Sequence, residues 1–368
     1  MSETKECAIV GGGLAGLVGY ATLRHRGLTP AEIDVFGTDA DPAGKWRVRA
    51  AAIRQRRMRS ESDGHCAPRS FPGLAVRASL RDKSPLPLVE SWLDRYHPTV
   101  EEFLEHVEEV RAESGWDESF RRCRVKRISA VDGGFELDDL GRFRHVLVAT
   151  GHPGLAFPPE LEGDPRAVHS YQPHEYAERV EIVGAGMAAA TEWLNALAAG
   201  SDVVSVRRRE PERRPLNLPR QLFTRRGLAA YHDTRPDERH ALLRRWSTPS
   251  YPAGRTWDDP VERARRAGRF RVAEQNGADQ VICATGFRRG YAHDPLLASL
   301  VAEHGLATAG DWIVLEQDST VGSLTDGERT LAIAGVAGQW AFPAADTLMG
   351  AKYAARGFLR KVLACRSR

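Results

Sequence analysis

The feature that most limits how this chain can fold is a glycine pattern near its start. Residues 7–17 read CAIVGGGLAGL, so Gly11, Gly13 and Gly16 stand in G-x-G-x-x-G spacing directly after an apolar run. Further apolar residues then recur at helical intervals, namely Leu14, Leu17, Val18 and Ala21. This order predicts a strand, a tight turn and a helix.

The same pattern returns at residues 181–197. Ile182 and Val183 have the character of a strand end. The turn positions are taken by Gly184, Gly186 and Ala189. The predicted helical stripe after them consists of Ala190, Trp193, Leu194 and Leu197.

The spacing has a specific chemical purpose. The first glycine permits the turn, the second lets a pyrophosphate approach the backbone, and the third lets helix and strand pack closely. The helix N-terminus then offers free N–H groups to the phosphates. Glycines that merely end a strand are the alternative, which two copies weaken. The predicted contacts are Gly11, Gly13, Leu14, Ala15 and Gly16 in the first unit and Gly184, Gly186, Met187 and Ala188 in the second.

Two such units require two domains, and 368 residues are enough for both. The predicted fold class is therefore α/β, with two Rossmann-like dinucleotide-binding domains. A content of 42% hydrophobic and 27% charged residues is typical of a globular protein.

Composition also excludes several kinds of partner. A net charge of +3 is too small for unspecific nucleic-acid binding. The five cysteines, at positions 7, 66, 123, 283 and 365, include no C-x-x-C pair, so neither a zinc site nor a disulfide framework is expected. The chain shows no apolar run of membrane-spanning length and begins without a cleavable leader, so we expect no membrane partner and a cytoplasmic location.

The residues after the second strand of each unit indicate what the ribose of the dinucleotide carries. In the second unit the predicted strand 203–206 is followed by Arg207, Arg208 and Arg209, with no acid before Glu210. Arginines pair with a 2′-phosphate, whereas an acid pairs with a free 2′-hydroxyl. The run therefore favours NADPH, with Arg207 and Arg208 as the binding residues, over the alternative of a basic surface turn.

The first unit departs from this rule. Its predicted strand 33–36 is followed by Gly37 where an acid is expected, and the nearest carboxylates belong to Asp39 and Asp41. Either Asp39 reaches the ribose from a bulged turn, or water and main chain hold the ribose.

The order of the remaining motifs resembles that of flavin-containing monooxygenases, the class B flavoproteins with two dinucleotide-binding domains. Besides the glycine patterns and the arginines, one matching segment is Pro42-Ala43-Gly44-Lys45-Trp46, where such proteins have a Gly-Gly-x-Trp-like loop. The others are VLVATGHPG at 146–154, His169-Ser170 and VICATGF at 281–287. Residues 215–257 are more loosely similar to amine N-hydroxylases, through Phe223, DERHALLRRW and Thr248-Pro249-Ser250-Tyr251.

The resemblance implies that the first unit binds FAD and that the two Ala-Thr-Gly segments are the crossings between domains. It places the FAD-binding domain at residues 1–152 plus 286–368 and the NAD(P)H-binding domain at 153–285. The added cofactor contacts are Lys45, Trp46, Thr150, Gly151, Thr285, Gly286 and Gln339.

Some positions differ from the family pattern. The F-x-G-x-x-x-H fingerprint is not intact, because Gly163 lies six residues before His169 and the Phe is missing. The Gly-Asp pair that commonly holds the flavin ribityl chain is Gly335-Val336 here. The general class is therefore better supported than monooxygenation itself.

Two helices are predicted outside the glycine units. Thr99 and Glu102 stand in capping-box spacing before a helix over 99–113, whose apolar stripe we expect in the core. Asp346 and Thr347 are in position to cap a C-terminal helix. Its N-terminus would either face the flavin pyrimidine and stabilise negative charge there, or serve packing alone.

The polar segment 54–66, RQRRMRSESDGHC, is predicted to line a substrate entrance. The catalytic candidates are Arg59, Asp63 and His65, with Trp46, Gln339 and Trp340 also at the flavin face. A hydrogen-bonded surface histidine is the alternative for His65. No metal-ligand spacing is recognisable.

The predicted activity begins with hydride transfer from NADPH to FAD. The resemblance implies that O2 is then used to oxidise a small molecule by N-hydroxylation, S-oxygenation or a Baeyer-Villiger reaction. Two alternatives remain, a dehydrogenase or reductase without oxygen insertion and a nucleotide-binding NADPH sensor with little turnover. The sequence predicts neither the substrate nor the oligomeric state.

Overall fold

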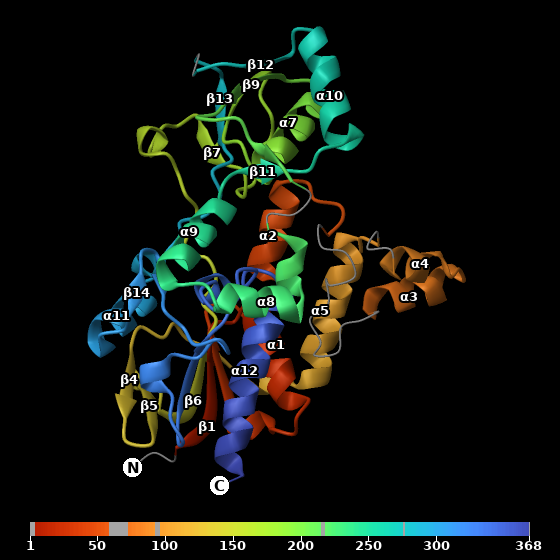
Figure 1. Ribbon diagram of the computed structural model, residues 1–368. Helices are drawn as coiled ribbons and strands as arrows, with labels where there is room; N and C mark the ends of the chain where they lie inside the picture. Colours follow the sequence, from red (N-terminus) through yellow and green to blue (C-terminus); the bar gives the residue numbers. More distant parts are fainter. Residues whose placement is uncertain (1–3, 59–72, 93–95, 215–217, 275–276, 368) are drawn as a thin grey trace.

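The computed structural model describes residues 4–58, 73–92, 96–214, 218–274 and 277–367 (Figure 1). Two sheets lie one above the other in this view, each with helices packed on it. The lower body carries both chain ends, and α2 (Gly44–Ala52) runs between the two bodies.

The lower sheet has seven strands in the order β3-β2-β1-β6-β5-β4, with β16 paired to β6. Its strands are β1 (Lys5–Val10), β2 (Ile33–Gly37), β3 (Phe120–Arg122), β4 (Ile128–Val131), β5 (Gly134–Leu137), β6 (Arg142–Val148) and β16 (Thr330–Ile333). The strands from β3 to β6, and β16, pair in parallel, while β5 is antiparallel to both neighbours. Alternate residues of β1 are buried on both faces of the sheet, which requires helices or loops on each side.

One face of the lower sheet is covered by α1 (Leu14–Arg24), α5 (Val100–Ser114) and α12 (Leu348–Arg366). Leu17, Phe103 and Phe358 from these helices pack in one core cluster with Ile9. The capping box of α5 is confirmed, because Glu102 N–H donates to Thr99 Oγ1 at 3.1 Å and Thr99 N–H donates to the Glu102 carboxylate at 2.8 Å. The short α6 (Trp116–Ser119) follows α5.

The upper sheet is entirely parallel, in the order β12-β9-β8-β13-β7. Its strands are β7 (Ala167–His169), β8 (Arg179–Val183), β9 (Asp202–Val206), β12 (Phe270–Val272) and β13 (Gln280–Cys283). α7 (Met187–Ala199) and α10 (Arg255–Arg266) pack on it around Trp193 and Phe270. The predicted α/β class is confirmed, with two helix-covered sheets of which the upper is entirely parallel and the lower is mixed. The domain boundaries at 152/153 and 285/286 stay a prediction.

A segment between β9 and β12 leaves the upper body. It contains β10 (Glu212–Arg213), α8 (Arg225–His232), α9 (Pro236–Trp246) and β11 (Ser250–Tyr251). Tyr231 of α8 and Leu243 of α9 join the second core cluster of the lower body. That cluster also holds α11 (Pro295–His304) and the hairpin of β14 (Thr308–Ala309) and β15 (Trp312–Ile313). Residues that lie between the two Ala-Thr-Gly segments in sequence therefore pack on the lower sheet.

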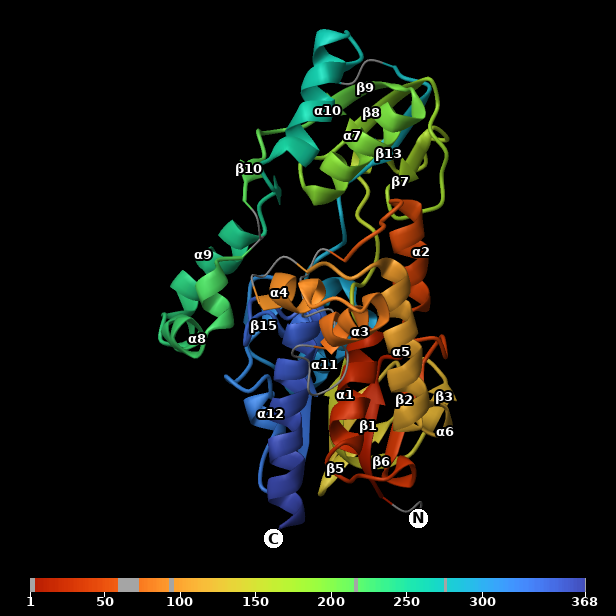
Figure 2. The same cartoon turned by 90° about the vertical axis from the view of Figure 1, so that its right-hand side faces the viewer.

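The two helices not yet described, α3 (Gly73–Asp82) and α4 (Leu86–Trp92), project beside α5 (Figure 1 and Figure 2). Among the described residues, no helix is both long and apolar enough to cross a membrane.

Candidate functional site: two glycine loops and the junction between the sheets

The first glycine loop lies between β1 and α1, and two of its glycines are fixed by close packing. Gly11 has φ +134°, and a Cβ there would lie 2.1 Å from the carbonyl oxygen of Ala149. A Cβ on Gly16 would lie 2.0 Å from the carbonyl oxygen of Gly11. Only glycine fits either position, so the predicted turn and close helix–strand packing are confirmed.

Gly13 has a different environment. It is the N-cap of α1 at φ −90°, and a Cβ added there meets no atom within 4 Å. The N-terminal end of α1 has no side-chain cap, and its first turn, which begins with Leu14 and Ala15, contains no acid. The helix N-terminus thus presents unsatisfied N–H groups and a partial positive charge to open space. This cradle fits a dinucleotide pyrophosphate.

The second loop, between β8 and α7, repeats the arrangement. Gly184 has φ +139°, and its Cβ would lie 2.5 Å from the carbonyl oxygen of Ala284. Gly186 is the N-cap of α7, again with no side-chain cap and no acid in the first turn, where Met187 and Ala188 stand. Unlike Gly13, Gly186 has a neighbour, because Pro249 lies 3.9 Å from its Cβ position. The segment before β11 therefore borders the second loop.

The helix predicted after the second loop is confirmed as α7, but its predicted apolar stripe is only partly buried. Ala190 and Trp193 are buried as expected, but Leu194 and Leu197 are only half-buried, and Glu192 takes a fully buried place. The hydroxyl of Tyr176 donates to Glu192 Oε2 at 2.6 Å, and His174 Nε2 lies 3.3 Å from the same oxygen. Burial is the largest single effect and lowers the pKa of His174, but the hydrogen bonds to Glu192 and to the Gln172 carbonyl and the charge of Glu192 together leave that pKa raised. Tyr176 and His174, which precede β8, thus give the buried Glu192 polar partners in place of an apolar contact.

The two Ala-Thr-Gly segments meet between the sheets. Gly151 and Gly286 adopt the same left-handed conformation, with φ +77° and +78°. The chain after them pairs, since Ala156 N–H donates to Gly286 O at 3.0 Å and Arg288 N–H donates to Gly154 O at 2.9 Å. The Thr285 hydroxyl donates to the carbonyl of Ala156, whereas Thr150 Oγ1 is buried without a partner. The two crossings form one connection between the bodies.

The structure explains why Gly37, the last residue of β2, stands where an acid is expected. A Cβ on Gly37 would lie 2.8 Å from the backbone of Gly12, so the glycine loop itself occupies that space. Asp39 is exposed, and its Oδ1 accepts a hydrogen bond from the N–H of Asp41 at 3.1 Å. Its role toward a ribose stays a prediction.

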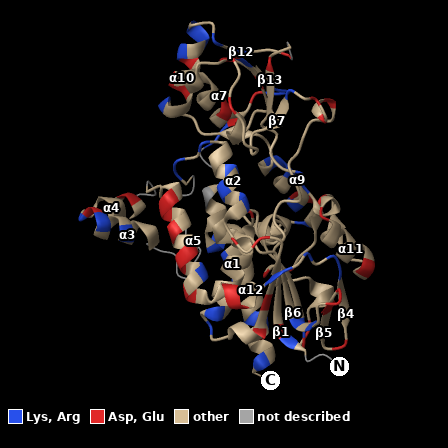
Figure 3. Ribbon diagram, turned by 180° about the vertical axis from the view of Figure 1, so that it is seen from behind, with Lys and Arg blue, Asp and Glu red and all other residues tan. Residues whose placement is uncertain are grey.

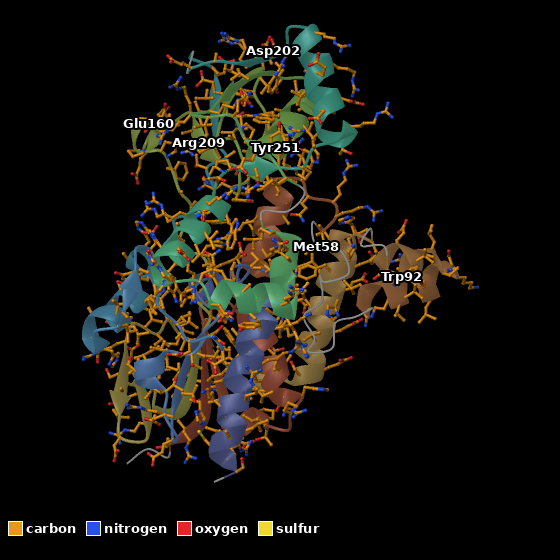
Figure 4. The ribbon with its side chains drawn as sticks, in the orientation of Figure 1. Met58, Trp92, Glu160, Asp202, Arg209 and Tyr251 are labelled. Carbon is orange, nitrogen blue, oxygen red and sulfur yellow. The ribbon has the colours of Figure 1, made fainter. Side chains whose placement is uncertain are left out.

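The arginines after β9 lie in two environments. The Arg207 side chain is 10% exposed and donates to Glu210 Oε1 at 2.7 Å. The Arg208 side chain is 86% exposed, and its nearest acid, Glu160, is 3.6 Å away. Figure 4 shows Arg209 and Glu160 on the same side of the upper body. Arg208 is therefore the more accessible cation for a phosphate, and the assignment of both residues stays a prediction.

The predicted loop Pro42–Trp46 is wrong in its second half, because α2 begins at Gly44. The run GKWRVRAAA contains good helix formers, which accounts for the helix. Lys45 is exposed, and the Trp46 ring meets the buried Phe103 ring at 4.8 Å. Trp46 thus helps to fix α2 against α5.

The end of α2 reaches the upper body, and Figure 3 shows basic residues along this helix at the junction. Asn195 Nδ2 of α7 donates to the carbonyl of Ile53 at 2.9 Å, and Arg54 pairs with Glu175 at 3.0 Å. Arg49 lies over the ring of Phe287, its guanidinium carbon 4.6 Å from the ring centre.

Phe287 is the centre of an aromatic cluster. His152 stacks on it at 4.0 Å between ring centres and Tyr171 at 4.9 Å, while His169 stacks on Tyr171. Burial lowers the pKa of both His152 and His169 to about 4, and the charge of Arg49 adds to this effect. Both histidines are therefore neutral near pH 7. Sequence reasoning missed Arg49 and Phe287 as a pair, since nothing in the sequence links positions so far apart.

The predictions for the C-terminal residues are confirmed for the helix cap and wrong for Trp340. Thr347 is the N-cap of α12 and accepts a hydrogen bond from Gly350 N–H at 3.1 Å, so the predicted helix and cap are confirmed, while Asp346 is exposed beside it. Gln339 Oε1 accepts a hydrogen bond from Trp312 Nε1 at 3.4 Å. Trp340 is only 1% exposed and belongs to the core, so its predicted place at a flavin face is wrong.

The three catalytic candidates Arg59, Asp63 and His65 lie outside the described residues. Their roles stay predictions.

The sheets, loops and crossings define the class of two-domain dinucleotide-binding folds. No protein-family model and no curated protein sequence matches the chain. Among solved structures, the chain is similar to an ornithine N-hydroxylase from Kutzneria sp. 744, determined with reduced FAD, NADP+ and L-ornithine (TM-score 0.76, 16% identity, covering 98% of this chain and 99% of that one). It is also similar to the ornithine hydroxylase of Pseudomonas aeruginosa (0.70, 18%, covering 98% and 100%).

A third similar structure is a bacillithiol disulfide reductase from Bacillus cereus, with a TM-score of 0.63 and 14% identity over 99% of this chain and 100% of that one. At these identities the likeness establishes the fold. The resemblance predicted from the sequence is thus confirmed at the level of the fold.

Proposed function

We propose that this chain is an NADPH-dependent FAD oxidoreductase that acts as a flavoprotein monooxygenase on a small molecule. The observation that carries the proposal is the pair of open helix N-termini at Gly13 and Gly186, one in each body, joined by the two Ala-Thr-Gly crossings. A single such cradle fits many nucleotides, whereas two connected ones fit two dinucleotides that exchange a hydride. The FAD and NADP+ bound to the Kutzneria enzyme support this assignment.

Each part of the site has a proposed role. The N–H groups at Leu14 and Ala15 hold the FAD pyrophosphate, and those at Met187 and Ala188 hold that of NADPH. Further proposed contacts are Asp39, Lys45, Thr150, Gly151, Arg207, Arg208, Thr285, Gly286, Gln339, Asp346 and Thr347. FAD supplies the chemistry, accepting a hydride from NADPH and then reacting with O2. The protein contributes binding, orientation and exclusion of water.

The N-terminus of α12 completes the proposed flavin environment. Thr347 caps this helix, whose first turn carries no acid. A helix N-terminus stabilises nearby negative charge, which is the charge that a reduced flavin acquires. We also propose residues 1–152 plus 286–368 as the FAD-binding domain and 153–285 as the NAD(P)H-binding domain, from which α8 and α9 return to the lower sheet. We also propose a cytoplasmic location, which the free thiols of Cys7, Cys123 and Cys283 support.

The test is the stoichiometry of oxygen use across a panel of an amine, a sulfide and a ketone. The account predicts that one member increases O2 consumption with NADPH while the release of hydrogen peroxide falls below the NADPH consumed. Complete recovery of consumed O2 as peroxide with every member would contradict monooxygenation.

The similarity to a bacillithiol disulfide reductase favours a second candidate, an NADPH-dependent reductase without oxygen insertion. As such a reductase, this chain would oxidise NADPH without O2 when given a disulfide or quinone acceptor. Anaerobic turnover with such an acceptor, together with full peroxide recovery in air, would select this candidate.

A further inference from the structure

Arg49 is a half-buried cation at the junction of the two bodies. It lies on α2, with its guanidinium carbon 4.6 Å from the centre of the Phe287 ring. Burial lowers the pKa of this guanidinium from its ordinary value, although arginine keeps its charge at any physiological pH. The side chain thus places a permanent positive charge where solvent is partly excluded.

Within the described part of the chain, no carboxylate pairs with Arg49. Two neighbouring arginines, one on α2 and one just after it, do have such partners. Arg47 lies 3.1 Å from Asp41 and 3.6 Å from Glu108, and Arg54 lies 3.0 Å from Glu175. A partly buried charge without a counter-ion costs free energy. A cation–π contact with Phe287 offsets only part of that cost.

The groups around Arg49 are neutral but polar. His152 and Tyr171 stack on Phe287, and His169 stacks on Tyr171. Among the described residues, His152 Nδ1 is buried and has no hydrogen-bond partner. Because the low pKa values leave both rings uncharged near pH 7, they add hydrogen-bonding atoms beside the guanidinium without adding a second charge.

We propose that Arg49 binds an anionic group, of the carboxylate class, on the small molecule that is oxidised between the two bodies. This inference rests on the proposed function. Phosphates of the two dinucleotides already have proposed partners at α1, at α7 and at the arginines after β9. Arg49 belongs to neither glycine loop nor to that arginine run, and it lies beside the residues that follow Gly151 and Gly286. An anion there supplies the missing counter-ion, and the guanidinium plane suits a carboxylate.

The test compares carboxylic acids with their primary amides, using hexanoate with hexanamide and benzoate with benzamide. Binding is followed by the visible flavin spectrum and by the shift in unfolding temperature, which needs no flavin. We expect wild-type protein to bind each acid at least ten-fold more tightly than its amide. Arg49→Gln should abolish this difference, and Arg49→Lys should retain part of it. Arg47→Gln, on the same helix but exposed and paired, is the matched control and should behave as wild type.

The competing explanations give different results. A ten-fold weaker affinity of Arg49→Gln for NADP+, with acid binding unchanged, would assign the residue to the nucleotide and overturn the proposal. A lower unfolding temperature without any change in acid preference would make Arg49 a structural clamp on Phe287, and would overturn it as well.

Failure of the proposed function gives a separate pattern. A yellow, NADPH-oxidising protein without acid preference rejects the anion site alone. A colourless protein that takes up no FAD, yet is stabilised by acids through Arg49, rejects the FAD assignment and keeps the site.

Discussion

The glycines of the first loop do different physical jobs although they share one motif. Gly16 is required by packing, because its Cβ would lie 2.0 Å from Gly11 O. Gly13 is not required by packing, since nothing lies within 4 Å of its Cβ position and its φ is −90°. Neither packing nor backbone conformation therefore requires a glycine at position 13, whereas a pyrophosphate on the helix N-terminus would require one.

We expect Gly13→Val and Gly16→Val to fail in different ways. Gly13→Val should fold with an unfolding temperature close to that of the flavin-free wild type, but should purify with little FAD. Gly16→Val should lose folded protein, because a clash with backbone cannot be relieved by moving a side chain. Flavin content and thermal unfolding separate the two. A fully flavin-loaded Gly13→Val protein would refute the assigned site.

Nicotinamide preference should depend on the exposed arginine. One or two charge-assisted contacts to a 2′-phosphate correspond to a preference for NADPH of roughly one to three powers of ten. Arg208→Ser should raise the KM for NADPH and leave that for NADH nearly unchanged, without loss of stability. Arg207→Ser should also lower the unfolding temperature, since the Arg207 side chain is largely buried and donates a hydrogen bond to Glu210. An equal loss with both nucleotides would mean that Arg208 does not read the phosphate.

At this scale, the sequence predicts residues whose role is local. The glycines and the Thr99 cap follow from spacing, and the structure has them as predicted. The prediction that Trp340 lies at the flavin face was wrong, because its burial depends on α8, α9 and the β14–β15 hairpin, which no local pattern brings together. Arg49 was missed for the same reason, since its partner Phe287 comes from the other crossing.

At the level of elements, α5 and α12 offer a matched pair of helix caps. Thr99 and Thr347 each accept a hydrogen bond from the N–H three residues on, at 3.1 Å in both helices. Replacing either by alanine should lower the free energy of unfolding by about 0.5–2 kcal/mol. Only Thr347→Ala should in addition weaken FAD binding or lower the flavin reduction potential. Equal flavin properties in both variants would restrict α12 to packing.

The elements themselves were predicted unevenly. The strand–turn–helix units were recognised, because apolar runs and glycine spacing are both local signals. The start of α2 was taken for a loop, because family resemblance outweighed the helix propensity of GKWRVRAAA. The buried Glu192 breaks the apolar stripe of α7, and its partners His174 and Tyr176 are set by the path of a loop that periodicity does not describe.

Buried histidines should make the stability of the whole molecule depend on pH. His145 in the lower sheet and His169 in the upper sheet are fully buried, and burial is the main cause that lowers the pKa of each to about 4. The unfolded chain binds protons at these positions below about pH 6.5, whereas the folded chain resists them. Stability is therefore complete above pH 6.5 and falls as the pH decreases toward 4.

Each of these histidines contributes a slope of at most about 1.4 kcal/mol per pH unit in that window. His145→Leu should reduce the slope of unfolding free energy between pH 6.5 and 4, measured by denaturant titration. The exposed His25 provides the control, since its replacement should leave the slope unchanged. An unaltered slope in His145→Leu would contradict a neutral buried ring.

Whole-molecule architecture was predictable only in part. Two nucleotide units imply two sheets, each with a parallel strand–helix–strand core, and the structure has them. The return of α8 and α9 to the lower sheet was not predictable, because it depends on contacts of Tyr231 and Leu243 with distant core residues. The same segment brings Pro249 next to Gly186, so it borders the second glycine loop and also packs in the lower core.

The central claim is that one chain binds FAD at the first glycine loop and NADPH at the second, close enough for hydride transfer. The most direct measurement is anaerobic titration of the purified, FAD-supplemented protein with NADPH and with NADH, followed by visible absorbance. The account predicts about one FAD per chain, bleached by one equivalent of NADPH and much more slowly by NADH. A protein that takes up no FAD, or one whose bound flavin NADPH does not reduce, would contradict it.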